Sequence, residues 1–545
     1  MSKNHWRLSI ATLVVASALA GCGSSGSDSS AKSDGGTATT AATKAPEAGE
    51  CTEDKAGGSV TMGVYSETTG LDPTVSSGAG VTGGSEMAAI YDSLMRYNTE
   101  TGEYDPWVAE SLEGNEDSTV WTLKLREGVE FGNGDPLTAE AVKASIARHQ
   151  DPEEKSRWLG MASNIEEMEV VDDLTLEFTL TEPFGTFPYV LAAEPGLIVN
   201  TKVVDEMGKE AFNAKPTGAG VGPFEIVSFT PGEGIKMKAK SDYWGGPVCL
   251  ENLNFVQIKG GQATYDALQK DEVQAAFLRE PRVIDEARKD GVSGFVTLQH
   301  GGELLLMNNG VDDTTPPTAD VRIRKAIAAA IDTEVLDQRV NEGTGISGSA
   351  IFPEQSRYYQ GQEGPAYDLE EAKRLVEEVK AEGDWDGTIE FDCDNTPMRT
   401  EMGITIQAML EAAGFDVKLD SGVTIGDVIQ KVRVDRDFEL ACWGLSATEA
   451  LPWVKLDELY SSTNKSNHTG YADPDYDAAL AELKAATDLD GQKAALAKIQ
   501  DIWNDTVPAE VLTTSEEVIF VNDELKGVVP GHNAYTYFGD AYLES

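Results

Sequence analysis

The chain has 545 residues, of which 40% are hydrophobic, and a formal net charge of −50 at pH 7. A chain of this length is expected to form roughly two to four domains rather than one core. The negative charge argues against nucleic acid as a partner, because phosphate binding requires a basic surface. The acidic residues are scattered, so we interpret them as a solvated surface that keeps the protein soluble.

The first residues predict export. A basic start precedes an apolar stretch, residues 8–19, that is too short to span a bilayer. The following Leu19-Ala20-Gly21-Cys22 resembles a bacterial lipobox. This resemblance implies a signal peptide over residues 1–21, a diacylglycerol on Cys22, and a lipid-anchored protein on the extracellular face of the cytoplasmic membrane. The alternative is an ordinary secretory signal with a chance cysteine.

Residues 22–57 are predicted to be the lipidated cysteine and a flexible tether. Gly, Ser, Ala and Thr dominate the segment from Ser24 to Glu50, and large apolar residues are almost absent. Such a segment cannot bury enough surface to offset the entropy lost on ordering. No later apolar run is long enough to span a membrane, so we expect the lipid to be the only membrane anchor.

The first half of the folded body is rich in strands and turns. Alternating or apolar runs predict the strands, and Thr138 is a candidate N-cap before Ala139-Glu140. The predicted strands are 58–64, 121–125, 222–229, 235–239 and 252–258, with a hairpin over 170–180, and the predicted helices are 85–94 and the one after Thr138.

After Pro317 strands and helices alternate with short loops, which is typical of a parallel sheet with right-handed crossovers. Gly414 lies where a helix C-cap is expected. The return to strand character at the end indicates two lobes, with a ligand site in the cleft between them. The predicted helices are 320–331, 369–381, 400–413, 425–432 and 476–505, and the predicted strands are 388–392, 416–419, 438–443, 518–520 and 525–529.

The cysteines and histidines predict no metal ion or other cofactor. The chain has five Cys and five His, without a CxxC pair or a Cys/His cluster. With Cys22 lipidated, four cysteines remain. Four cysteines can form disulfides in three combinations, and the number of cysteines does not choose among them. The remaining cysteines are Cys51, Cys249, Cys393 and Cys442.

One long run carries a family resemblance. Residues 104–145 read YDPWVAESLEGNEDSTVWTLKLREGVEFGNGDPLTAEAVKAS. This run resembles the signature of the extracellular solute-binding proteins of oligopeptide, dipeptide and nickel uptake systems. Three later blocks agree in order, so the resemblance covers residues 58–545. They are GVGPF at 220–224 with YWGG at 243–246, LMNN at 306–309 with DVRIRKA at 320–326, and GYADPDYD at 470–477.

The resemblance implies an α/β, two-lobed periplasmic-binding-protein fold of the large three-domain type, with a discontinuous first lobe and an interlobe ligand cleft. Lobe one is expected over 58–305, with an inserted subdomain over about 105–215. Lobe two is expected over 306–512, and 513–545 return to lobe one. The hinge is expected near 305–309 and 512–515.

The resemblance also implies the function. We expect the substrate-binding component of an ABC importer, which captures a peptide-like solute and delivers it to the permease subunits. The protein is expected to be a monomer and not an enzyme. The alternatives are a non-peptide solute such as a sugar, a sensor that uses the same cleft, and an exported hydrolase. No strong catalytic motif is present, and few histidines make nickel the weakest ligand.

Peptide-binding relatives often place an Asp after the strand that corresponds to 438–443, where it pairs with the ligand's α-ammonium. In this chain Thr448 falls at that position and Glu449 follows it. Either Glu449 takes that role, or the ligand lacks a free amine. Trp443 and Trp453 are further candidates, as ligand-stacking surfaces or as core residues.

Two other groups of residues are candidates for the ligand site. Tyr65, Ser66 and Glu67 follow the first predicted strand, and binding residues gather at such strand-end loops. Asn308 and Asn309 lie at the expected hinge.

The strand pattern also predicts the disulfides. Cys393 and Cys442 fall at similar ends of two strands that are candidate neighbours. We therefore predict a Cys393–Cys442 bond, which leaves Cys51–Cys249 as the second pair. Cα separations beyond about 7 Å would exclude either bond.

Overall fold

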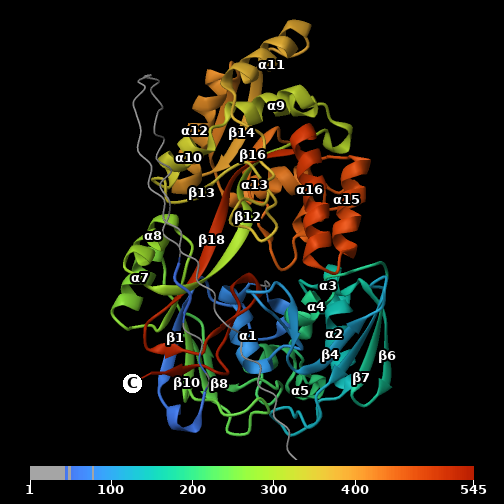
Figure 1. The fold of residues 1–545 in the computed structure, drawn as a ribbon, viewed down its shortest axis with the longest axis vertical. Coiled ribbons are helices and arrows are strands. Elements are labelled where there is room, and N and C mark those ends of the chain that lie inside the picture. Colours follow the sequence, from blue (N-terminus) through green and yellow to red (C-terminus); the bar gives the residue numbers. More distant parts are fainter. Residues whose placement is uncertain (1–42, 47–48, 50, 77–78, 545) are drawn as a thin grey trace, which may run out of the picture. The chain divides into compact units, whose positions relative to one another are not determined.

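The computed structural model describes residues 43–46, 49, 51–76 and 79–544 (Figure 1). The predicted signal peptide, the lipidated Cys22 and most of the tether lie outside the described residues. Within the described ranges, no helix combines the length and the apolar character needed to cross a membrane. The same ranges hold no cluster of His, Cys, Asp and Glu side chains able to bind a metal ion.

The largest sheet has twelve strands and mixes parallel with antiparallel pairs. Its second-half strands β14, β15 and β16 pair in parallel, as predicted from the alternation of strands and helices. In sheet order the strands are β15 (Asp416–Val423), β14 (Thr388–Asp394), β16 (Leu440–Trp443), β12 (Ser293–Met307), β18 (Ala509–Val521), β11 (Ala275–Leu278), β1 (Ser59–Val64), β10 (Asn252–Gln257), β9 (Gly234–Ala239) and β8 (Phe224–Thr230); β13 (Ile346–Ser347) and β17 (Ala447–Thr448) pair with β18 and β12.

A separate antiparallel sheet forms between residues 109 and 180. Its order is β4 (Ala109–Gly114), β5 (Val120–Leu125), β7 (Thr175–Leu180) and β6 (Ile165–Asp172). The β6–β7 pair is the predicted hairpin. Helix α2 (Ala139–Gln150) packs against β6 and β7. The Thr138 hydroxyl accepts a bond from Ala141 N at 3.2 Å, which confirms the predicted N-cap.

The remaining helices surround these sheets. The predicted single helical stretch over 476–505 is wrong in one respect, because the chain breaks at Ala486 and Asp488 caps a new helix through Gly491 N. The helices are α1 (Gly84–Tyr91), α3 (Leu159–Ala162), α4 (Pro188–Ala192), α5 (Thr201–Met207), α6 (Lys209–Ala214), α7 (Gly261–Gln269), α8 (Pro281–Lys289), α9 (Val321–Ala330), α10 (Thr333–Val340), α11 (Leu369–Glu382), α12 (Pro397–Ala412), α13 (Ile425–Ile429), α14 (Trp453–Tyr460), α15 (Pro474–Ala485) and α16 (Leu489–Thr506).

Separate hydrophobic cores lie along the main sheet. One core packs β1 and β8–β10 with α1 and the C-terminal tail. Another packs β14–β16 with α9, α11 and α12. A third joins the four-stranded sheet to α14–α16. The long strands β12 and β18 contribute residues to these cores at different points along their length.

Strands β12 and β18 form an antiparallel ribbon through the middle of the main sheet (Figure 1). Pairing runs from Ser293↔Val521 to Leu306↔Ala509, with register shifts around Glu303. Gly301 has φ +58°, and a Cβ on Gly302 would lie 2.0 Å from Ser515 Oγ. The bulge therefore requires small residues at both positions.

Both disulfides have the pairing predicted from the sequence. Cys393 bonds to Cys442 with a Cα separation of 4.9 Å, and Cys51 bonds to Cys249 with 5.6 Å. Cys393 and Cys442 are neighbours because β14 and β16 pair in parallel. The first bond therefore fixes β16 to β14 just before residues 444–448.

Candidate ligand-binding site

A cavity of about 320 Å³ lies at the bulge of the β12–β18 ribbon. Its walls come from distant parts of the sequence, because the sheet topology brings the ribbon, the end of β11, residues 446–455, α4 and the C-terminal tail together. The polar residues that line it include Arg279, Gln299, Thr448, Ser515, Glu517 and Asn533.

Register explains why these polar side chains meet. Gln299 pairs with Ser515 across the ribbon and with Thr448 of β17 on its other side. Leu278, the last residue of β11, pairs with Val518 of β18, so Arg279 and Glu517 both lie next to the end of this ladder. Opposite residues of antiparallel strands share a face of the sheet. A row of polar groups therefore crosses β17, β12 and β18 at the cavity, and Arg279 at the end of β11 also lines it.

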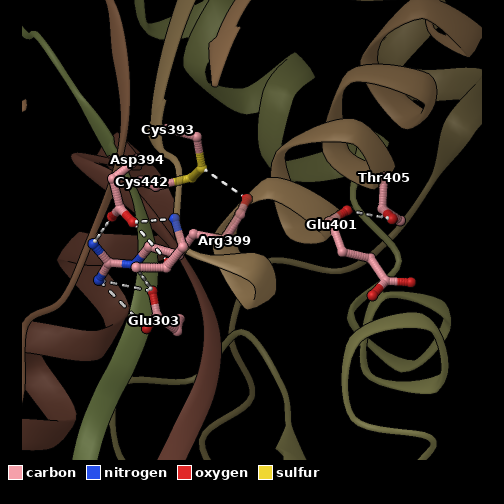
Figure 2. Close-up of a disulfide and its surroundings, with 8 residues drawn as sticks. Glu303, Cys393, Asp394, Arg399, Glu401, Thr405 and Cys442 are labelled. Carbon is pink, nitrogen blue, oxygen red and sulfur yellow. Dashed lines mark hydrogen bonds and ion pairs between the residues drawn. A yellow bond between two sulfur atoms is a disulfide. The ribbon is translucent and has the colours of Figure 1, made fainter. Parts of the chain in front are cut away.

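Several charges at the cavity already have partners. Lys455 Nζ lies 2.6 Å from a Glu458 carboxylate oxygen. Arg399 lies between two carboxylates, Glu303 at 3.1 Å and Asp394 at 2.9 Å, beside the Cys393–Cys442 bond (Figure 2). This network connects strand β12 to β14, so it fixes the ribbon next to the bulge.

Glu449 lines a smaller recess that adjoins the cavity through Thr448 and Asn533. Its carboxylate accepts bonds from Ser356 Oγ and Arg357 N, both at 3.0 Å, and from Arg357 Nε at 3.2 Å. Burial alone would raise the pKa of Glu449, but His300 Nε2 at 3.5 Å and Arg357 lower that pKa to about 2. Glu449 is therefore an ionised carboxylate with its own protein partners.

The Glu449 network also connects distant segments. Arg357 Nη2 donates to Thr99 O at 2.6 Å, and the Arg357 guanidinium lies 5.7 Å from the Tyr97 ring centroid. Tyr104 OH donates to Ala450 O, also at 2.6 Å. These bonds tie the hairpin of β2 (Met95–Tyr97) and β3 (Tyr104–Pro106) to the segment that follows β17.

The structure brings some of the predicted site residues to this region. Thr448 lines the cavity and Glu449 the recess. Tyr65 is half exposed, and its ring lies 5.2 Å below the Arg279 guanidinium. Ser66 and Glu67 are not among the residues that line the cavity; Glu67 accepts a bond from Gly232 N in the β8–β9 turn.

The other predicted residues have structural partners. Asn308 donates to Phe438 O and accepts from Gly310 N and Val311 N. Asn309 donates to Met307 O and Pro508 O. Trp443 packs against His468 and Arg433, and Trp453 packs against Phe184 and donates to Thr186 Oγ1. None of these four lines the cavity.

Sequence reasoning missed Arg279, Gln299, Ser515 and Glu517. Their signal is a polar interruption in apolar strand sequence. Glu517 ends the run Thr-Thr-Ser-Glu-Glu just before Val-Ile-Phe-Val, and Arg279 follows Ala-Ala-Phe-Leu. A polar side chain within such a strand needs a cavity or a partner, so the interruption marks a site.

The polar cavity at the bulge of the β12–β18 ribbon is a place where a small solute can bind. The model of the family described as "Bacterial extracellular solute-binding proteins, family 5 Middle" matches residues 103–467. The chain belongs to this family. It is an extracellular solute-binding protein, the non-enzymatic binding component of an ABC importer.

The chain is also similar to individual solute-binding proteins. The chain is 24% identical to the dipeptide-binding protein of Escherichia coli (strain K12) over 496 residues, which are 86% of this chain and 91% of that protein. It is 25% identical to the glutathione-binding protein GsiB of Shigella dysenteriae over 409 residues, or 73% and 78%. The structure of Helicobacter pylori DppA with the peptide STSA superposes with a TM-score of 0.70 at 23% identity, over 90% of this chain and 99% of that one.

Proposed function

We propose that this protein captures a peptide-like solute in the cavity at the ribbon bulge and passes it to a membrane permease. The observation that carries the proposal is the cavity itself. It is lined by opposite charges and amide and hydroxyl groups, which are the groups that recognise the ends and the backbone of a peptide. The relatives named for dipeptides and glutathione support the same class of ligand.

We further propose that the β12–β18 ribbon passes from one lobe to the other, and that the two lobes move relative to each other. Residues 58–305 and 513–545 form lobe one, and residues 306–512 form lobe two. The bonds from Arg357 to Thr99 and from Tyr104 to Ala450 then cross from one lobe to the other. They hold the lobes together around the ligand, in the manner of a hinged closure.

Thermal unfolding tests the proposal. The mature protein is heated with free peptides of two to eight residues, glutathione, oligosaccharides and nickel salts. A ligand at about 100 times its Kd adds about 2.7 kcal/mol to the free energy of unfolding, which raises the Tm measurably. We expect a shift with peptide-like solutes. A shift with sugars alone would contradict the peptide-like ligand, and no shift with any solute would contradict the proposed function.

The anchor is a second part of the proposal. Cys22 carries a diacylglycerol, and the protein is a monomer held on the extracellular face of the membrane. We expect the wild-type protein to partition into detergent and the Cys22→Ser variant to remain in the aqueous phase, because acyl chains add about 0.8 kcal/mol per buried CH₂. Mass spectrometry of the N-terminal peptide checks the attached lipid. Aqueous partitioning of both proteins would contradict the anchor.

A further inference from the structure

The cavity contains an arginine whose charge is available to a ligand. Arg279 follows β11, is exposed and lines the cavity. Within the described part of the chain its guanidinium makes no hydrogen bond and no ion pair, and its nearest ring is Tyr65, at 5.2 Å. A guanidinium held over an aromatic face keeps its planar fork of donors open for a carboxylate.

A carboxylate faces the same cavity from the next strand. Arg279 follows Leu278 and Glu517 precedes Val518, the last residue pair of the β11–β18 ladder, and both side chains line the cavity. Glu517 accepts one bond, from Gln299 Nε2 at 3.3 Å. Burial raises the pKa of Glu517 and Arg279 opposes that rise, so its carboxylate gains from a cation placed beside it.

The other charges near the cavity have ion-pair partners within the protein. Lys455 is paired with Glu458, Glu303 with Arg399, and Glu449 with Arg357. Glu449 is therefore engaged at the place where peptide-binding relatives often carry the ammonium-binding Asp. Among the described residues, the charged groups that line the cavity and have no ion pair are Arg279 and Glu517.

These two charges select against simple ions. A ligand with only a carboxylate would meet Arg279 but would be repelled by Glu517. A ligand with only an ammonium would meet Glu517 but would be repelled by Arg279. A zwitterion pairs with both groups. A ligand with a single charge pairs with one group and is repelled by the other, so it binds more weakly.

We propose that Arg279 binds the carboxylate and Glu517 the ammonium of a small zwitterionic ligand whose charges lie within one residue of each other, as in an amino acid or a dipeptide. The inference rests on the proposed function and moves charge recognition from residues 448–449 to the ribbon. The cavity of about 320 Å³ lies at the small end of ligand pockets, which agrees with such a ligand.

Native mass spectrometry with defined libraries tests this assignment. The mature protein is incubated with the common amino acids, with an equimolar dipeptide library, and with the same library N-acetylated or C-amidated. We expect a free-ended species to bind at least about tenfold more tightly than its capped forms, because each cap removes a charged hydrogen bond. The first two arms identify whether the zwitterion is an amino acid or a dipeptide.

Matched variants assign the two charges. Arg279→Gln is expected to abolish the preference for a free carboxylate while keeping that for a free ammonium, and Glu517→Gln is expected to do the reverse. Arg282→Gln is the control, because Arg282 lies three residues on in α8, is exposed and pairs with Glu342. Its preferences should equal those of the wild type. Thermal unfolding of each ligand-free variant confirms that it folds.

Three outcomes would overturn the inference: capped libraries that bind as well as the free-ended one, preferences unchanged in both variants, or no binding of any free-ended species. If another solute then binds in the thermal unfolding experiment, the solute-binding function stands, and only the assignment of Arg279 and Glu517 as the ligand's charge partners fails. If no solute binds in either experiment, the proposed function fails as well.

Discussion

Replacing Glu449 with glutamine is expected to lower the free energy of unfolding at pH 7 by about 2–3 kcal/mol. A carboxylate whose pKa falls from 4.5 to about 2 on folding stabilises the folded state by about 3 kcal/mol. The expected loss of about 2–3 kcal/mol extends below this value, since His300 Nε2 at 3.5 Å is too distant from the Glu449 carboxylate for a good hydrogen bond. The bonds from Ser356 and Arg357 add to the stabilisation.

The pH dependence identifies this mechanism. Because the pKa is lower in the folded state, the stabilisation is complete above pH 4.5 and is lost as the pH falls toward 2. Urea unfolding from pH 7 to pH 3 should therefore show the two proteins converging in stability at low pH. Glu354→Gln, an exposed change in the same loop as Arg357, should match the wild type throughout. A stability difference that does not vary with pH would exclude the carboxylate as its cause.

Replacing Arg324 with methionine is expected to lower the free energy of unfolding by about 3–5 kcal/mol. Arg324 is 7% exposed, and its guanidinium donates to Thr506 O and Val507 O at the end of α16. It also donates to Thr318 O and Ala319 O. Methionine keeps the apolar packing but leaves these buried carbonyls without donors and removes the positive charge from the helix C-terminus.

Arg322 provides the matched control in the same helix. Arg322 lies near the surface and pairs with Asp320 and Glu382. Arg322→Met should lower the free energy of unfolding much less than Arg324→Met, since exposed ion pairs contribute little. Guanidinium chloride unfolding of both variants measures the difference. If both variants lost the same free energy of unfolding, the hydrogen bonds from Arg324 to the carbonyl groups would not be the source of the expected stabilisation.

Local pattern predicted the elements that depend on nearby residues. The Thr138 cap, the hairpin of β6 and β7 and the parallel strands β14–β16 follow from spacing within a few residues. The break at Asp488 was missed because alanine-rich sequence favours helix on both sides of it. Strand β12 was also missed, since Gly301 and Gly302 interrupt the strand pattern although the ribbon continues through them.

The site was less predictable because it depends on register between distant strands. Thr448 and Glu449 were found through the resemblance, yet the partners of Glu449 lie about 90 residues earlier in the chain. Arg279 and Glu517 are more than 200 residues apart and meet only because β11 pairs with β18. No local pattern contains that pairing.

The position of β18 has a consequence for biosynthesis. β18 lies between β12 and β11 in the main sheet, although both of these strands precede it in the chain and are made before it. A nascent chain that stops before Ala509 leaves two inner strands with open edges, which are prone to mispairing. The main sheet is therefore completed only after β18 has been made, and a shorter chain has two separate parts of the sheet in place of one continuous sheet.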